Sequence, residues 1–451
     1  MTKGYNLSMP RISTGLLRNK KKRVMKIFLI LIGLAILAVI VYFIPPVHDR
    51  LSWRLINLRA KIFYFFNPPE EVSFSPEQQA EMAEIVKQSQ TAMVPTATFT
   101  LSPTTTPTNY VSPTQTQTAT PTPSPTPIPD RVRLEGVVHE YQKFNNCGPA
   151  NLSMALSYWG WEGDQFVTAA YLKPIQEDRN VMPYEMVDFV NQETRFSALM
   201  RSGGDIDLIK RFIAAGFPVL IERGFKDEVP NKYWMGHYAV ITAYDDTTEK
   251  FLIQDSYVME DYPNDYDFIN RHWRAFNYLF IIVYPPDREA EVLEILGPNA
   301  DEMHNYQSAA QRAVEETSVL KGLELFFAWF NYGTNLMYLG DYYGSAQAYD
   351  QAYELYADLV SKPWRITWYQ TGPYFAYYYT GRYQDVISLA DITLSYSSNQ
   401  PSIEESWVWR GRAKVALGDI EGGIEDFRSA LEWHPGWWVA EQELRNLGVE
   451  P

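Results

Sequence analysis

The stretch YQKFNNCGPANLSMAL, residues 141–156, carries the strongest local signal in the chain. Polar residues before Cys147 give way to an apolar run that predicts a helix over 148–159. Gly148 and Pro149 suit its first turn, because the N–H that proline lacks would be unpaired there anyway. The free N–H groups and the positive dipole end of a helix favour thiolate over thiol. This position predicts a reactive cysteine.

Cys147 is the only cysteine among the 451 residues, so no disulfide can form within one chain. A buried, inert thiol is the ordinary alternative, because free cysteine often behaves as a small core residue. A disulfide to another chain is a second alternative. The position at a helix start favours the reactive thiol over both.

His237 is the favoured base for this thiol among six histidines. It follows Gly236, which leaves room for a substrate backbone, and it opens an apolar run over 238–244 that predicts a strand. The chain then turns near residue 246 and returns through a second predicted strand, 251–254, to Asp255. A hairpin centred there would make His237 and Asp255 cross-strand neighbours, with the carboxylate orienting the imidazole. The alternative is a surface histidine beside an acidic turn.

Gln142 completes the candidate site, because its side-chain amide could bind an oxyanion together with the backbone N–H of Cys147. This constellation resembles the bacteriocin-processing, double-glycine-type peptidase family, a branch of the papain-like cysteine peptidases, over residues 136–284. The resemblance implies Cys147 as nucleophile, His237 as general base and acid, Asp255 as orienting acid and Gln142 as oxyanion donor. Ser256 stands where that family usually has proline, and no transporter domain is attached, so leader-peptide processing does not carry over.

The sequence lacks the motifs of zinc-dependent and phosphate-binding enzymes. His139-Glu140 is not a zinc-protease motif, since Lys143 occupies the place of the second histidine. No glycine-rich phosphate loop is present in the sequence, and we expect no metal and no cofactor. The net charge of −15 argues against nucleic acid as a partner, because that affinity comes mainly from clustered Lys and Arg.

The charge is unevenly placed along the chain. Residues 1–26 carry +8 with no acid, so the rest of the chain sums to −23 within the net −15. The uncharged run 27–44 is about 27 Å long as a helix, just enough to span a membrane. The preceding cations predict that 1–26 is a cytoplasmic tail and that the folded domains lie outside the cell membrane. A cleaved signal peptide is the alternative, although 45–48 offers no small-residue cleavage site.

Two segments connect this anchor to the folded part. Residues 45–90 mix cations and aromatic residues and are expected to form a juxtamembrane amphipathic and helical segment. Residues 91–130 are rich in Thr and Pro and predict a disordered stalk on the cell surface.

The globular part divides at residue 286. Over 131–286, predicted helices at 148–159, 182–192 and 206–215 precede predicted strands at 218–221, 238–244, 251–254 and 278–284, which indicates an α+β fold.

Residues 287–451 read as helix and contain a repeat whose glycines are Gly340, Gly381 and Gly418. The repeat resembles tetratricopeptide repeats, in which small residues let paired helices approach. Pro373 predicts a bent or shortened first helix in the middle copy.

The leading functional hypothesis is a membrane-anchored cysteine peptidase that acts on a peptide or protein, with helical repeats that bind a protein partner. Two alternatives remain open at this stage. One is a catalytically idle peptide receptor or scaffold, and the other is a papain-like transpeptidase or transamidase that uses the same acyl-enzyme.

Overall fold

The computed structural model describes residues 25, 26, 28, 29, 31–33, 41, 42, 128–173, 175, 178–226, 234–395 and 403–451. The chain divides into two compact units, residues 1–70 and 71–451. The few described residues of the predicted membrane segment 27–44 are helical, and no helix within the described part is long and apolar enough to cross a membrane. The rest of that segment, together with 1–24, 45–90 and most of the stalk, lies outside the described residues. Those expectations stay predictions.

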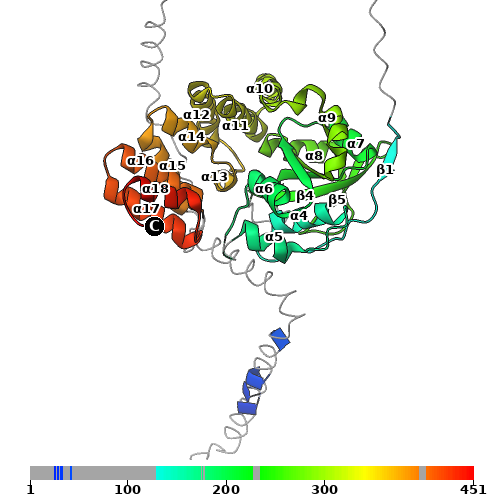
Figure 1. Ribbon diagram of the computed structural model, residues 1–451, viewed down its shortest axis with the longest axis horizontal. Helices are drawn as coiled ribbons and strands as arrows, with labels where there is room; N and C mark the ends of the chain where they lie inside the picture. Colours follow the sequence, from blue (N-terminus) through cyan, green and yellow to red (C-terminus); the bar gives the residue numbers. More distant parts are fainter. Residues whose placement is uncertain are drawn as a thin grey trace, which may run out of the picture. The chain divides into compact units, whose positions relative to one another are not determined.

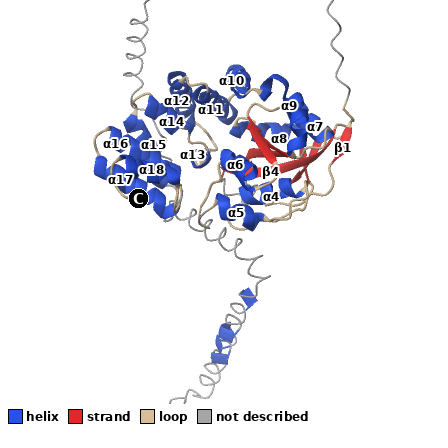
Figure 2. Ribbon diagram, viewed as in Figure 1, coloured by secondary structure: helices blue, strands red, loops and turns tan. Residues whose placement is uncertain are grey.

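An antiparallel sheet forms the centre of the α+β domain (Figure 2). Its strand order is β2-β7-β3-β4-β5-β6, and β1 also pairs with β4. The strands are β1 (Arg131–Arg133), β2 (Ser197–Arg201), β3 (Val219–Lys226), β4 (Trp234–Asp245), β5 (Lys250–Gln254), β6 (Tyr262–Asp265) and β7 (Phe280–Tyr284).

Helices cover both faces of this sheet, because successive side chains of a strand point to opposite faces. On β3, Leu220 packs among residues of the first helical layer, whereas Val219 and Ile221 pack among residues of the second. The first layer contains α4 (Cys147–Ser157), α5 (Gln165–Leu172) and α6 (Pro183–Glu193). The second contains α7 (Ile206–Ala214), α8 (Tyr266–Trp273) and α9 (Glu289–Leu296). Burial on both sides holds the central strands rigidly in place.

The elements predicted from the sequence are present, with shifted ends. The three predicted helices correspond to α4, α6 and α7, and the four predicted strands to β3, β4, β5 and β7. The short elements β1, β2, β6, α5 and α8 were not predicted, because each is only three to eight residues long, too short for its period to be distinguished in the sequence.

Among its described residues, 287–395 and 403–451, the helical region contains three antiparallel helix pairs. Their turns use Gly340, Gly381 and Gly418 at φ of 81°, 77° and 92°, a conformation that favours glycine. A Cβ on Gly411 would lie 2.6 Å from the Phe427 ring, so glycine is also what lets the third pair approach. The pairs are α11 (Gly322–Tyr338) with α12 (Tyr342–Tyr356), α14 (Gly372–Tyr379) with α15 (Tyr383–Ser395), and α16 (Glu404–Ala416) with α17 (Ile420–Trp433). Helix α10 (Glu302–Val319) precedes them and α18 (Trp438–Asn446) follows.

The middle pair departs from the other two as predicted from Pro373. Its first helix, α14, has 8 residues, whereas α11 has 17 and α16 has 13. The chain before it forms the short α13 (Ile366–Tyr369). The shortened helix thus leaves room for an extra segment between α12 and α14.

The α+β domain and the helical region share one hydrophobic core. Trp234 and Phe276 of the α+β domain pack with Phe327 of α11, and the Trp234 and Phe276 rings are stacked at 5.7 Å. Asn277 and Asn335 exchange two side-chain hydrogen bonds of 2.7 and 3.1 Å within this buried junction. The helical region is therefore docked on the α+β domain along its first pair, and is not a module on a free linker.

Candidate active site

Cys147 is the first residue of α4, and its side chain is partly exposed. The preceding turn contains Asn145 at φ 55°, and the Lys173 ammonium holds this turn by donating to the carbonyls of Phe144 and Asn145 at 3.3 and 3.2 Å. Residues 148–156 behind the cysteine are buried. The helix therefore presents the thiol at the surface of the core from a rigid support.

His237 and Asp255 meet beside this thiol. The Nε2 atom of His237 is 3.0 Å from Oδ1 of Asp255, and both side chains are buried. The His237 side chain also hydrogen-bonds the thiol of Cys147. The structure thus brings the three residues together in the order thiol, imidazole, carboxylate.

The Asp255 carboxylate is held from four directions. Besides His237, its Oδ1 atom accepts the backbone N–H groups of Tyr257 and Val258, each at 2.9 Å. Its Oδ2 atom accepts a guanidinium N–H of Arg223 at 2.5 Å, and Arg223 is only 1% exposed. The carboxylate cannot turn away from the imidazole without breaking several bonds.

The hairpin that joins the base to the acid differs from the predicted one. Val240 pairs with Gln254 and Tyr244 with Phe251, so the turn lies one to two residues later than predicted, and a bulge interrupts the ladder between Ile241 and Ala243. His237 and Asp255 are therefore not cross-strand partners. Their side chains still meet, because Asp255 directly follows the last residue of β5 and its carboxylate extends to His237 in the first half of β4.

The electrostatics favour a charged thiolate–imidazolium pair. Burial alone would raise the pKa of the Cys147 thiol, but the hydrogen bond and charge of His237, the backbone N–H of Tyr238 and the charge of Lys173 together lower it. Burial alone would likewise lower the pKa of His237, but the charge and hydrogen bond of Asp255, together with Cys147, raise it to about 9. Opposing shifts of this kind are what a cysteine nucleophile needs.

Gln142 is linked to Cys147 by hydrogen bonds that pass through Ser256 and Asn151. Its backbone N–H donates to the Ser256 carbonyl at 2.9 Å, and its Oε1 atom accepts the Ser256 hydroxyl at 2.9 Å. Asn151 of α4 in turn donates to the Ser256 hydroxyl at 2.9 Å and to the Cys147 carbonyl at 2.8 Å. With its oxygen engaged, the Gln142 amide keeps its NH₂ group for another acceptor.

Two family models match parts of the chain. Residues 133–280 match the model of the Peptidase_C39 like family, and residues 404–436 match a tetratricopeptide repeat. The chain therefore contains a C39-like peptidase domain and a tetratricopeptide repeat. No curated protein gives a significant match.

Two solved structures resemble part of the chain. A proposed C39-like peptidase from Bacillus anthracis is 17% identical with a TM-score of 0.28, covering 34% of this chain and 96% of that one. Xylellain, a cysteine protease from Xylella fastidiosa, is 15% identical with a TM-score of 0.26, covering 35% of this chain and 87% of that one.

The pH dependence of the C39-like domain should follow His237. Because its pKa of about 9 lies above the ordinary 6.5, the imidazolium stabilises the fold fully below pH 6.5, and this contribution is lost as pH rises through about 9. Above that pH the neutral imidazole also cannot protonate a leaving amine. We expect kcat/KM for an amide to fall about tenfold per pH unit above pH 9. A profile that stays flat to about pH 10.5 would contradict this assignment.

Three polar residues that lie beside the candidate site were missed from the sequence. Glu222 and Arg223 are adjacent on β3, where two charges interrupt a run of apolar residues, and that interruption was the available signal. Burial raises the pKa of Glu222 well above its ordinary value, and the nearby Cys147 charge raises it further. The third, Ser256, was noted only as a departure from the family pattern.

Ser256 provides a test of how Gln142 is oriented. In Ser256→Ala the Gln142 oxygen loses its hydroxyl donor, so the side-chain amide can rotate out of the orientation that we expect for oxyanion binding. We expect kcat to fall about tenfold to a hundredfold with little change in KM, as for a weakened oxyanion donor. Ser256→Thr keeps the hydroxyl and is the matched control. Equal losses in both variants would mean that the hydroxyl does not act through Gln142.

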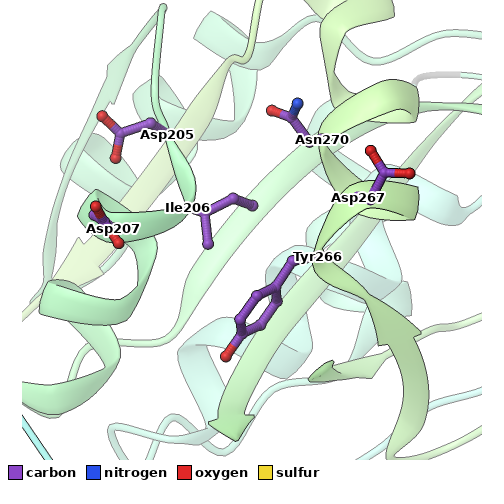
Figure 3. Close-up of a pocket in the computed structure, with 6 residues that line it drawn as sticks. All are labelled: Asp205, Ile206, Asp207, Tyr266, Asp267 and Asn270. Carbon is purple, nitrogen blue, oxygen red and sulfur yellow. The ribbon is translucent and has the colours of Figure 1, made fainter. Parts of the chain in front are cut away.

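A pocket of the C39-like domain lies between the start of α7 and α8 (Figure 3). Three carboxylates line it, and each is already engaged. Asp205 caps α7, Asp207 lies 3.7 Å from Lys210, and Asp267 lies 3.2 Å from Arg271. The pocket includes none of the residues of the Cys147 network, so it is separate from the candidate active site.

Proposed function

We propose that the chain is a cysteine peptidase that attacks a peptide or amide carbonyl with Cys147. The observation that carries this proposal is the continuous network in which Arg223 holds Asp255, Asp255 holds His237, and His237 hydrogen-bonds the thiol. A buried carboxylate and a buried imidazole beside a partly exposed thiol, in this order, form the arrangement used for nucleophilic acyl transfer.

The chemistry follows from the placement of these groups. The Cys147 thiolate attacks the carbonyl carbon, and the resulting oxyanion is bound by the backbone N–H of Cys147 and the side-chain NH₂ of Gln142. His237 then gives its proton to the departing amine, which leaves a thioester on Cys147. Neutral His237 next takes a proton from a water molecule as the water oxygen attacks the thioester carbon. Collapse of this second tetrahedral intermediate breaks the C–S bond, which releases the carboxylic acid and restores the Cys147 thiolate beside the His237 imidazolium.

We further propose that residues 27–44 anchor the protein in the cell membrane as a single span. The eight cations of 1–26 keep that tail in the cytoplasm, and the C39-like domain and repeats then lie outside. The tetratricopeptide repeat supports a protein partner for the helical region, because stacked helix pairs of this kind present extended surfaces for binding.

A direct experiment tests the peptidase proposal. The full chain is incubated with a peptide-mimetic, thiol-reactive acylating probe and, separately, with a defined peptide library whose products are mapped by mass spectrometry. Reaction of Cys147 much faster than a free thiol, together with new peptide ends, supports hydrolysis. Products joined to an added amine acceptor would instead assign transpeptidase or transamidase chemistry. A probe rate no faster than that of a free thiol contradicts the proposal and favours an idle peptide receptor.

A further inference from the structure

The first half of β4 has one edge that no strand of the described chain covers. One edge of β4 pairs with β3 along residues 234–241. The opposite edge pairs with β5, but only from Val240 onward, so it is open before that residue. The backbone N–H of Tyr238 points from the open edge to the Cys147 sulfur. N–H groups two residues apart point to the same side of a strand, so the N–H of Gly236 lies on this edge as well, about 7 Å farther along. This edge is where an extended peptide would pair its backbone beside the thiol.

Tyr369 of the helical region lies against Gly236 together with the Phe276 ring, whose Cζ atom is 2.7 Å from the position of a Cβ on Gly236. The Cδ1 and Cε1 atoms of Tyr369 lie 3.0 and 3.1 Å from the point that a Cβ on Gly236 would take. The ring makes edge contacts with Trp234 at 6.1 Å and Phe276 at 5.9 Å. The backbone N–H of Gly236 lies near enough to the Tyr369 hydroxyl to lower its pKa, but burial has the larger effect and raises that pKa to about 12. The hydroxyl is therefore neutral, and its oxygen can accept an N–H as a peptide carbonyl would.

The segment that carries Tyr369 is fixed from both sides. Gln370 donates to the Ala275 carbonyl of the C39-like domain at 2.8 Å. The guanidinium of Arg179 lies 5.1 Å over the ring of the buried Trp368. Within the helical region, Thr367 shares a hydrogen bond of 2.7 Å with Thr393 of α15. Helix α13 lies between the repeats and β4 (Figure 1), and these contacts hold it in a fixed position beside the site.

We propose that Tyr369 is the specificity-determining residue of this peptidase: it fills the backbone-pairing position at Gly236 and so limits how far a substrate chain extends along β4. This inference rests on the proposed function and deepens it. With the Tyr369 ring packed against Gly236, a substrate has room for about two residues along this edge before it meets that ring. The substrates are therefore chain ends or short peptides, and a segment inside a long extended chain is excluded unless Tyr369 is displaced.

The repeats acquire a second role from this arrangement. The shortened middle pair, which leaves room for α13, places a side chain of the helical region beside the catalytic strand. Removing the repeats would thus change which substrates are accepted, besides removing a surface for partners.

Epoxysuccinyl peptides provide the test, because they alkylate a thiol and can be extended in either direction from the reactive carbon. Probes with one residue and with six residues on each side are compared on the full chain by the rate of Cys147 alkylation. Wild type should react faster with the short probes. In Tyr369→Ala the long-to-short rate ratio should rise at least about tenfold in one direction, since the edge is opened.

Two further variants keep the test interpretable. Tyr369→Phe retains the ring and loses only the hydroxyl, so it should raise the ratio less than Tyr369→Ala does. Tyr343→Ala removes an exposed tyrosine elsewhere in the helical region and should leave the ratio at the wild-type value. An unchanged ratio in both Tyr369 variants, in both directions, would overturn the proposal. That outcome is distinct from failure of the peptidase function, which appears as a short-probe rate no faster than that of a free thiol.

Discussion

Cys147→Ala should abolish acylation by a peptide-mimetic probe and lower the rate of amide cleavage by at least about 10⁴-fold. The variant keeps α4 and the His237–Asp255 pair but removes the atom that attacks the carbonyl. Without it, the oxyanion donors can bind a substrate but cannot form the thioester. The rate is measured by the release of new amino ends from a peptide that wild type cleaves.

Cys147→Ser is the matched control for this result. A serine hydroxyl fits the same space, but the features that lower the pKa of a thiol do not bring an alcohol near ionisation at neutral pH. We expect a loss close to that of Cys147→Ala, with both variants unfolding near the wild-type temperature. More than about 1% of wild-type cleavage in Cys147→Ala would show that another group is the nucleophile.

The meeting of Cys147, His237 and Asp255 was predictable because each residue carries a local signal. Cys147 precedes a helix, His237 opens a strand, and Asp255 closes the next strand, and such boundaries are visible in residue patterns. The side-chain contact between His237 and Asp255 was predicted for an inexact reason. The bulge at Ile241 shifts the pairing, and a bulge has no reliable signature in a single sequence.

What escaped prediction depends on contacts between distant segments. Arg223 binds Asp255 across 32 positions of sequence, and Ser256 reaches Gln142 across 114. The docking of the helical region escaped for the same reason. Trp234 and Phe276 look like ordinary core residues of the α+β domain, and only the structure shows that they pack against Phe327. A repeat pattern predicts how helices pair with each other but not what the stack is docked on.

Asp255→Ala should lower both activity and stability, for two separable reasons. The imidazole loses the partner that fixes its orientation and raises its pKa, so kcat/KM should fall by about 10⁴-fold. The guanidinium of Arg223 also loses its carboxylate while it remains buried, which should cost about 3–5 kcal/mol of unfolding free energy. Denaturant unfolding and kcat/KM, measured on the same preparation, report the two effects.

The double variant Asp255→Ala/Arg223→Met separates these effects. Methionine removes the buried charge and fills much of the same space, so the double variant should unfold at a higher denaturant concentration than Asp255→Ala alone. Its activity should stay as low as that of the single variant, because the imidazole still lacks its acid. Recovery of activity along with stability would mean that Asp255 serves only to balance Arg223, and that His237 is oriented by its other contacts. The predicted outcome, stability without activity, instead assigns Arg223 to hold the acid and Asp255 to hold the base.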